Sequence, residues 1–229
     1  FSSNEKDLTN GPNNPYSLVR LFNKGEDSVK VILYRDNHAW CPYCQKVWLW
    51  LESKQIPYRV KKVTMRCYGE KENWYLKKVP SGLLPALELN QSLITESDQI
   101  LLALEESYGA LGLPLENPKI LYLRDLERRI FRAWCVWLCS PSFNSFHESR
   151  KESQFRVVLK EMNDYLSTMK TDWLDPSFTK MEGSLPGGID IIFIPYLERM
   201  NASLAYYKGV KIREDFQNID KWFRAFEQL

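Results

Sequence analysis

The residues of this chain best suited to chemistry are two cysteines in the stretch WCPYC at positions 40–44. They follow an apolar run at 29–34 and open a stretch with helical spacing. Unpaired N–H groups at the start of a helix, together with its dipole, favour a thiolate over a thiol. Pro42 suits the first helical position. We therefore predict that Cys41 is a nucleophile. Cys44, one turn further on, should be less accessible and either resolves a disulfide on Cys41 or is inert.

The cysteine pair has two other interpretations, a zinc site and a buried structural pair. A zinc site needs about four ligands, and beyond the pair the chain offers Cys67 and two histidines, with no second ligand pair at finger spacing. Free cysteines are often buried as small hydrophobic residues, but a cysteine beside a proline at the start of a helix, next to Trp40 and Tyr43, is expected to be an exposed reactive site. A C-x-x-C between a strand and a helix favours thioredoxin-like redox chemistry without a metal.

Two further motifs follow the cysteine pair. Pro85 stands at the entrance of an expected strand, where a proline is tolerated, and in a thioredoxin-like domain we expect its peptide bond to be cis. Leu84 would then present its backbone toward Cys41. Glu96 and Ser97 lie where a strand meets a helix, so they either cap that helix or bind a ligand carboxylate and amine there.

Composition narrows the classes of protein. The 229 residues are 44% hydrophobic and 14% aromatic, enough for one large core or two small ones. A net charge of +2 without long single-sign runs argues against nucleic acid as the main partner. The apolar stretches are too short to span a bilayer, which predicts a soluble protein. Five cysteines without a secreted-type framework favour a reducing compartment. Because the chain begins with Phe1, we expect a natural start upstream that could include a targeting peptide.

Hydrophobic periodicity predicts two domains joined by a linker. Residues 1–27 indicate an extended leader, and residues 109–117, rich in glycine and proline, indicate the linker. Residues 28–108 predict an α/β domain of order βαβαββα, and residues 118–229 predict an all-helical bundle. The expected strands are 29–35, 58–64, 85–90 and 92–95, and the expected helices are 41–54, 69–78, 97–108, 118–139, 149–170, 189–203 and 215–228.

A stripe of aromatic residues marks the first helix of the second domain. Phe131, Trp134 and Trp137 recur at a spacing of three. Most such stripes are core, and the alternative is that part of this one lines a pocket for a flat hydrophobic acceptor. Arginines at 124, 128 and 132 either bind an anionic acceptor or form a solvated face.

Taken together, these motifs resemble the cysteine-type classes of the glutathione transferase superfamily: omega, lambda and the dehydroascorbate reductases. The resemblance rests on Cys-Pro-Tyr-Cys at 41–44, the segments 71–75 and 80–85, and Glu96-Ser97. The stretch 34–47 is most similar to the iota class of photosynthetic organisms. The implied architecture is a thioredoxin-like domain that binds glutathione and a helical domain that covers an acceptor pocket.

The resemblance also implies roles for individual residues. Cys41 would face the glutathione sulfur, Lys71 would pair with a glutathione carboxylate, and Leu84 would hold the cysteinyl backbone. Glu96 and Ser97 would bind the γ-glutamyl end. Tyr43 and Pro85 are expected to contact glutathione as well, and Trp40 would join Phe131, Trp134 and Trp137 at the acceptor pocket. Some such classes form homodimers and others are monomers, and the iota class points to the chloroplast.

The chain departs from the family pattern at two positions. Gly187 precedes Asp190 where family members usually carry Ser or Thr as a helix cap, and glycine caps more weakly. Many omega-like members have another residue in place of Cys44. Its presence here adds dithiol, glutaredoxin-like chemistry to the reactions to be considered.

These features lead to three functional hypotheses. The first is a glutathione-dependent thiol transferase or reductase that acts through Cys41 on glutathionylated substrates, dehydroascorbate or glutathionyl-quinones. The second is a non-catalytic carrier of a hydrophobic heteroaromatic ligand. The third is an adaptor that keeps the fold without binding glutathione.

Overall fold

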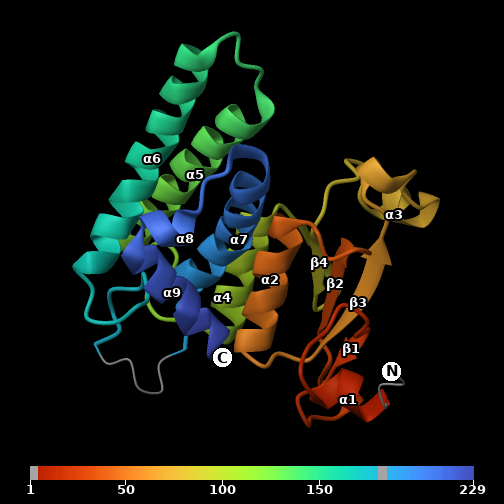
Figure 1. The fold of residues 1–229 in the computed structure, drawn as a ribbon. Coiled ribbons are helices and arrows are strands. Elements are labelled where there is room, and N and C mark those ends of the chain that lie inside the picture. Colours follow the sequence, from red (N-terminus) through yellow and green to blue (C-terminus); the bar gives the residue numbers. More distant parts are fainter. Residues whose placement is uncertain (1–4, 180–184) are drawn as a thin grey trace. The chain divides into compact units, whose positions relative to one another are not determined.

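The chain forms two compact units, Phe1–Gly109 and Ala110–Leu229, in a computed structural model that describes residues 5–179 and 185–229 (Figure 1). None of the helices in these described ranges is long and apolar enough to cross a bilayer.

The first unit is built on a mixed sheet. Its described strands lie in the order β1-β3-β2-β4-β5. β2 and β3 are parallel, with Asp36 opposite Val63, and the other three pairs are antiparallel. The parallel pair matters for the site, because it brings the carboxyl ends of two strands to one edge of the sheet. The strands are β1 (Val19–Arg20), β2 (Val31–Asp36), β3 (Tyr58–Val63), β4 (Ala86–Leu89) and β5 (Ser92–Thr95).

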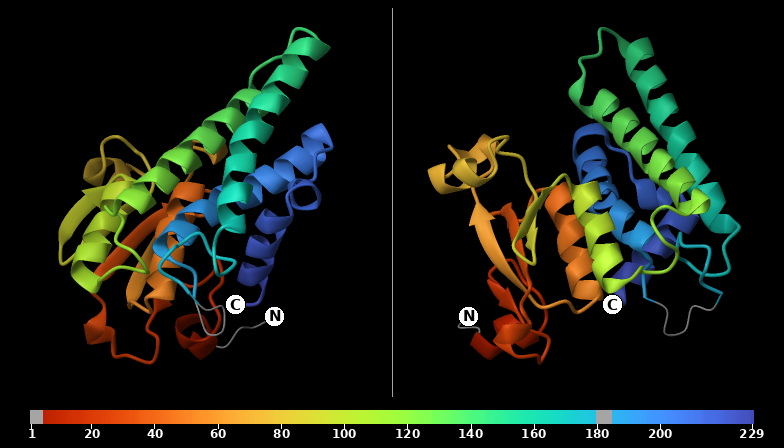
Figure 2. Two further views of the ribbon diagram at one scale, coloured as in Figure 1. Left: turned by 90° about the vertical axis from the view of Figure 1, so that its left-hand side faces the viewer. Right: turned by 180° about the vertical axis from the view of Figure 1, so that it is seen from behind.

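Helices cover both faces of this sheet. α2 and α4 pack against each other and against the central strands, and they lie side by side in Figure 2. On the opposite face, Tyr75 of α3 packs on Tyr34 and Val63, because alternate residues of a strand point to opposite faces. The helical segments are α1 (Glu5–Asn10), η1 (Glu26–Ser28), α2 (Pro42–Ser53), η2 (Arg66–Tyr68), α3 (Asn73–Lys78) and α4 (Ser97–Tyr108).

The predicted fold class, a βαβαββα domain followed by a helical region, is confirmed. In the first unit the structure differs from the sequence prediction chiefly in two places. The helix expected over 69–78 begins only at Asn73, and η2 precedes it. The segment expected to be an extended leader contains α1 and β1, and its residues 1–4 lie outside the described ranges. β1 joins the sheet by pairing with β3, and its buried Arg20 donates to Glu52 of α2 at 2.9 Å, which links the extra strand to that helix.

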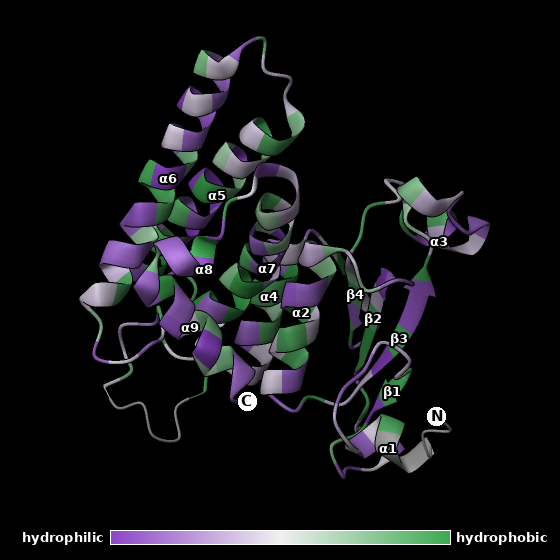
Figure 3. Cartoon of the chain, in the orientation of Figure 1, coloured by the Kyte–Doolittle hydropathy of each residue, from purple (hydrophilic) through white to green (hydrophobic). Residues whose placement is uncertain are grey.

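The second unit is helical throughout its described elements. α5 packs against α6 and α7, and α6 also packs against α9. α7 is buried along most of its length, and Figure 3 shows hydrophobic residues there and hydrophilic ones along α6. The helices are α5 (Pro118–Cys139), α6 (Ser145–Ser167), α7 (Gly188–Lys208), α8 (Ile212–Asp215) and α9 (Gln217–Glu227).

The start of α7 is organised by a buried carboxylate. Asp190 is fully buried, and its Oδ1 accepts from the backbone N–H of Leu174 at 2.7 Å and from the indole of Trp222 at 2.8 Å. Its Oδ2 accepts from the N–H of Gly187 at 3.0 Å. Burial raises the pKa of Asp190 to about 7, although these hydrogen bonds act in the opposite direction. One side chain thus links α7, α9 and the segment before α7.

Gly187 is the N-cap residue of α7, and the structure explains why it is glycine. A Cβ at this position would lie 2.6 Å from the Cβ of Asp175. Asp175 is itself buried, and its Oδ2 accepts from the N–H of Leu113 at 2.8 Å. A Ser or Thr at this position, which is usual in the family that the chain resembles, would collide with Asp175, whose carboxylate already accepts the hydrogen bond from Leu113.

We predict that Asp190→Ala destabilises the protein by roughly 3 kcal/mol, because three buried donors lose their acceptor. The loss should be larger at about pH 5 than at about pH 8. A raised folded-state pKa means that the native protein binds the proton more tightly, so the contribution of Asp190 to stability falls as pH rises from about 4 to about 7.

Urea denaturation followed by circular dichroism at both pH values measures this effect. Asp164→Ala, which removes a surface ion pair with Lys160, is the matched control and should leave the midpoint almost unchanged. Equal loss in the two variants would contradict the role of Asp190.

Candidate active site

Cys41 stands at the junction of the central sheet and α2. β2 ends at Asp36, and a short loop leads to Cys41, which is the N-cap residue of α2 with φ −70° and ψ 115°. Its carbonyl accepts the first helical hydrogen bond, from Gln45 at 3.0 Å, and Pro42 occupies the first turn. Only 8% of Cys41 is exposed, so the expectation of an exposed cysteine is wrong, although the residue lines a cavity. The thiol therefore sits where the N–H groups of α2 converge.

The two thiols of the motif have opposite electrostatics. A hydrogen bond from the Cys44 thiol lowers the pKa of Cys41 to about 7, with help from the backbone N–H groups of Cys44 and Tyr43, and it outweighs the effect of burial. Burial is the main cause that raises the pKa of Cys44, which is only 1% exposed. Near neutral pH, Cys41 is partly thiolate while Cys44 remains a thiol that donates to it.

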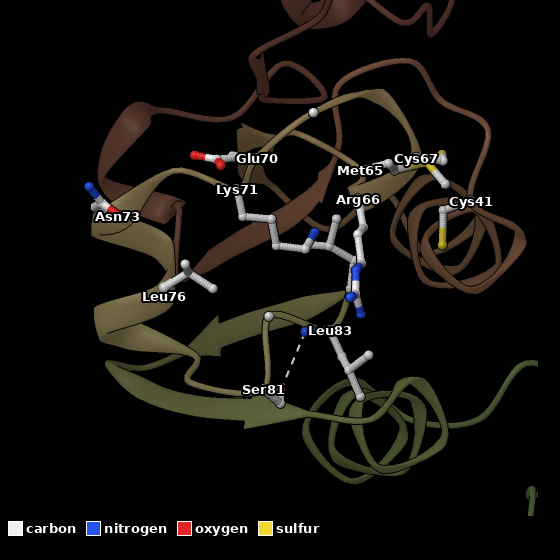
Figure 4. A pocket seen from close by; sticks show the side chains of 13 residues that line it. Cys41, Met65, Arg66, Cys67, Glu70, Lys71, Asn73, Leu76, Ser81 and Leu83 are labelled. Carbon is white, nitrogen blue, oxygen red and sulfur yellow. Dashed lines mark hydrogen bonds between the residues drawn. The ribbon is translucent and has the colours of Figure 1, made fainter.

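Cys41 lies at a cavity of about 880 Å³ within the first unit (Figure 4). The amino group of Lys71 donates to the carbonyl of Thr64 at 2.9 Å, and the side chains of Lys71 and Arg66 both extend into the cavity. Two cations beside a partly ionised thiol suit an anionic, sulfur-bearing ligand. The lining residues are Cys41, Met65, Arg66, Cys67, Gly69, Glu70, Lys71, Asn73, Leu76, Ser81, Gly82, Leu83 and Leu84.

The Leu84–Pro85 peptide bond is cis, as the motif predicts. Leu84 lines the cavity at this point, and the hydroxyl of Tyr75 donates to the carbonyl of Leu83 at 2.5 Å. This hydrogen bond connects the loop before Pro85 to α3.

The remaining predicted ligand residues lie outside the lining of this cavity. Ser97 is the first residue of α4 and is buried, and Glu96 before it is exposed with φ 64°. Neither they nor Tyr43 and Pro85 are among the lining residues. Of the six predicted glutathione contacts, the cavity brings together Lys71 and Leu84.

The predicted acceptor residues divide between the units. Trp40 belongs to the first unit and is 59% exposed, so its ring is open to a ligand. In the second unit, Phe131 and Trp134 are half-buried with ring centroids 5.6 Å apart. The guanidinium of Arg128 lies 4.9 Å from the Phe131 ring, which makes it a cation–π partner.

Trp137 is a core residue, the first alternative given for the aromatic stripe, and its surface is not available to an acceptor. It is 1% exposed, its indole donates to Glu148 at 2.8 Å, and its ring packs on Phe155 at 5.5 Å. The spacing of three predicts a shared helix face. It does not show that α6 covers the end of that face.

Sequence reasoning missed two charged residues behind the cysteines. Asp36 is fully buried, its Oδ2 accepts from the backbone N–H of Trp40 at 2.6 Å, and its Oδ1 has no partner among the described residues. Its negative charge opposes ionisation of both thiols. Arg35 is also buried, and its guanidinium lies 4.1 Å from the Trp48 ring. The signal available in the sequence was the charged pair Arg35-Asp36 at the end of an otherwise apolar strand.

Metal-binding residues do not gather at this site. Among the described residues, no group of three or more histidine, cysteine, aspartate or glutamate side chains is arranged to hold a metal ion.

Comparison with known proteins finds matches to a family model, to curated relatives and to solved structures. Residues 40–107 match the family model described as glutathione S-transferase, N-terminal domain. The probable glutathione S-transferase DHAR2 of Oryza sativa subsp. japonica, a chloroplastic protein, is 26% identical over 81% of this chain and 61% of its own length. The chloroplastic glutathione S-transferase DHAR3 of Arabidopsis thaliana is 28% identical over 74% and 58%. Glutathione S-transferase omega-1 of Sus scrofa is 27% identical over 71% and 64%. The chain thus spans less than two thirds of each of these relatives.

Solved structures share the fold. The trimeric glutathione transferase TDR1 of Leishmania superposes with a TM-score of 0.69 at 21% identity, over 87% of this chain and 43% of that one. The glutathione transferase URE2P6 of Phanerochaete chrysosporium, in complex with oxidized glutathione, gives 0.64 at 17% identity, over 87% and 91%. The resemblance to the cysteine-type glutathione transferases is confirmed. The assignment to the iota class stays a prediction.

We predict that Cys44→Ala raises the midpoint pH of Cys41 alkylation by about one unit, because the thiolate loses a hydrogen-bond donor. Cys44→Ser should shift the midpoint less, since its hydroxyl still donates. The rate of iodoacetamide labelling of the Cys41 peptide, followed against pH by mass spectrometry, measures both. An unchanged midpoint in the alanine variant would show that Cys44 does not tune Cys41.

Proposed function

We propose that the protein is a glutathione-dependent thiol transferase whose nucleophile is Cys41. The single observation that carries this proposal is a thiol with its pKa lowered to about 7, at the start of a helix and on the wall of a cavity that also holds Lys71 and Arg66. A thiolate reacts with a disulfide, whereas a serine or tyrosine would only activate the glutathione thiol for conjugation.

The proposed reaction has two exchanges. The Cys41 thiolate attacks the glutathione sulfur of a mixed disulfide, so that a Cys41–glutathione disulfide forms and the substrate thiolate leaves. The thiolate of a second glutathione then attacks the bound glutathione sulfur, releasing glutathione disulfide and regenerating the Cys41 thiolate. The net reaction converts the mixed disulfide and one glutathione into the substrate thiol and glutathione disulfide, without any other oxidant or reductant.

Binding of glutathione is assigned to the residues that the family resemblance names. Lys71 would pair with a carboxylate and Leu84 would hold the cysteinyl backbone, and both line the cavity. Glu96 and Ser97, at the start of α4, would bind the γ-glutamyl end, with Tyr43 and Pro85 as flanking contacts. Trp40, with its exposed ring, would meet the acceptor.

Dehydroascorbate and glutathionyl-quinones are further acceptors within the range of this chemistry. The chloroplastic names of two relatives are compatible with a plastid, and a reducing compartment suits free thiols. The carrier of a heteroaromatic ligand is the alternative, and a protein that binds such a ligand but transfers no thiol would support it.

We predict that Cys41→Ser abolishes thiol transfer from a small glutathione mixed disulfide, because an alcohol at this position is not ionised at neutral pH. A glutathione-coupled assay measures the loss, and retention on a glutathione column checks that the site is intact. Cys139→Ser, which changes an exposed cysteine of the second unit, is the control and should keep full activity. A Cys41 variant with most of the wild-type rate would exclude Cys41 as nucleophile.

Lys71→Ala should raise the KM for glutathione about tenfold, equivalent to the loss of one charge-assisted hydrogen bond of about 1.5 kcal/mol. The range of acceptors should not change, because the substitution removes a contact to glutathione only. Lys77→Ala, on the exposed last turn of α3, is the matched charge control. The same KM in both variants would remove Lys71 from the glutathione site.

A further inference from the structure

The cavity at Cys41 is lined by a second thiol, Cys67, which the proposed reaction does not use. Cys67 lies in η2 and is exposed, whereas Cys41 is 8% exposed. Both residues line the same cavity, and Figure 4 shows them toward the same end of it. The site therefore holds a pair of thiols from two different loops.

The topology of the sheet explains this pairing. β2 and β3 are parallel neighbours, so the loop that carries Cys41 and the turn that carries Cys67 leave the same edge. The backbone N–H of Asn37 donates to the carbonyl of Val63 at 3.0 Å, which extends the pairing past β2. The rings of His38 and Tyr68 are 4.4 Å apart, so they join the two loops next to the two cysteines.

Cys44 is poorly placed to attack a disulfide in the cavity. It is 1% exposed within α2 and does not line the cavity. Burial opposes its ionisation, and its hydrogen is donated to Cys41. A resolving thiol must reach the disulfide as a thiolate. Cys67 is solvent-exposed on the cavity wall, so its sulfur is accessible to a disulfide formed at Cys41.

We propose that Cys67 is the resolving thiol of this site, an inference that rests on the proposed function of Cys41. Once Cys41 carries glutathione, the Cys67 thiolate attacks the Cys41 sulfur. The Cys41–glutathione bond breaks, glutathione leaves as its thiolate, and a Cys41–Cys67 disulfide forms. Two glutathione molecules then reduce that disulfide in turn, giving back both thiols and one glutathione disulfide.

The exchange requires the η2 turn to bring the two sulfur atoms to about 2.05 Å. The turn is made of exposed residues, Arg66 through Glu70, so its displacement uncovers no core side chain. Within the turn, Tyr68 N–H donates to the carbonyl of Met65 at 2.9 Å. The pairing therefore costs a surface rearrangement and leaves the sheet intact.

The test exposes fully reduced protein to glutathione disulfide, blocks free thiols with N-ethylmaleimide, and maps disulfides by non-reducing peptide mass spectrometry. We expect the wild type and Cys44→Ser to contain a Cys41–Cys67 disulfide without bound glutathione. Cys67→Ser should instead hold one glutathione on Cys41. Cys139→Ser, an exposed cysteine outside this unit, is the control and should match the wild type.

Two results would contradict the inference in different ways. A wild type that keeps glutathione on Cys41, or that forms a Cys41–Cys44 disulfide, would overturn the role of Cys67 and leave Cys41 as the nucleophile. A wild type with no disulfide at Cys41, together with a Cys67→Ser variant that carries no glutathione on Cys41, would overturn the proposed function and the role of Cys67 together.

Discussion

The hydrogen bond from the Cys44 thiol to the Cys41 sulfur is the interaction on which the chemistry of this protein depends. It is the largest cause of the lowered pKa of Cys41, and it joins the N-cap residue of α2 to a residue in the first turn of the same helix. In this bond Cys44 acts as a hydrogen-bond donor, a role that it fills as a neutral thiol. Burial raises the pKa of Cys44 and so keeps its thiol protonated. Because a protonated thiol can donate a hydrogen bond, the burial of Cys44 helps to stabilise the Cys41 thiolate.

The rest of the first unit holds this bond in place. β2 ends at Asp36, five residues before Cys41 at the start of α2. The carboxylate of Asp36 accepts a hydrogen bond from the backbone N–H of Trp40, next to Cys41. Arg35 donates to the carbonyls of Asp36 and Pro15, both at 2.8 Å. The N-terminal segment is therefore connected to the back of the site by a buried arginine. On the cavity side, the cis bond before Pro85 and the Tyr75–Leu83 hydrogen bond fix the opposite wall.

Local signals in the sequence were sufficient to predict most of the helices and strands, and they pointed to Cys41 as the candidate nucleophile. The C-x-x-C spacing with a proline between predicts a helix that starts at the first cysteine, and the match to a thioredoxin-like motif predicts the cis bond before Pro85. Long-range contacts could not be predicted. β1 is two residues long and exists because Val19 and Arg20 pair with β3, so no periodicity marks it. The position of Cys67 in the cavity depends on the parallel register of β2 and β3, and the burial of Trp137 depends on α6. Both depend on contacts between elements that are distant in the sequence, and the spacing of residues within one element does not predict such contacts.

The most direct test of the central claim is the pH dependence of the first exchange. The second-order rate constant with which the protein takes glutathione from a small mixed disulfide would be measured by stopped flow from about pH 5 to about pH 10, across the range in which thiols ionise. If Cys41 is poised as the structure indicates, the rate rises with an apparent pKa of about 7. A rate that follows the ionisation of an ordinary thiol, near pH 8.5, would contradict the account.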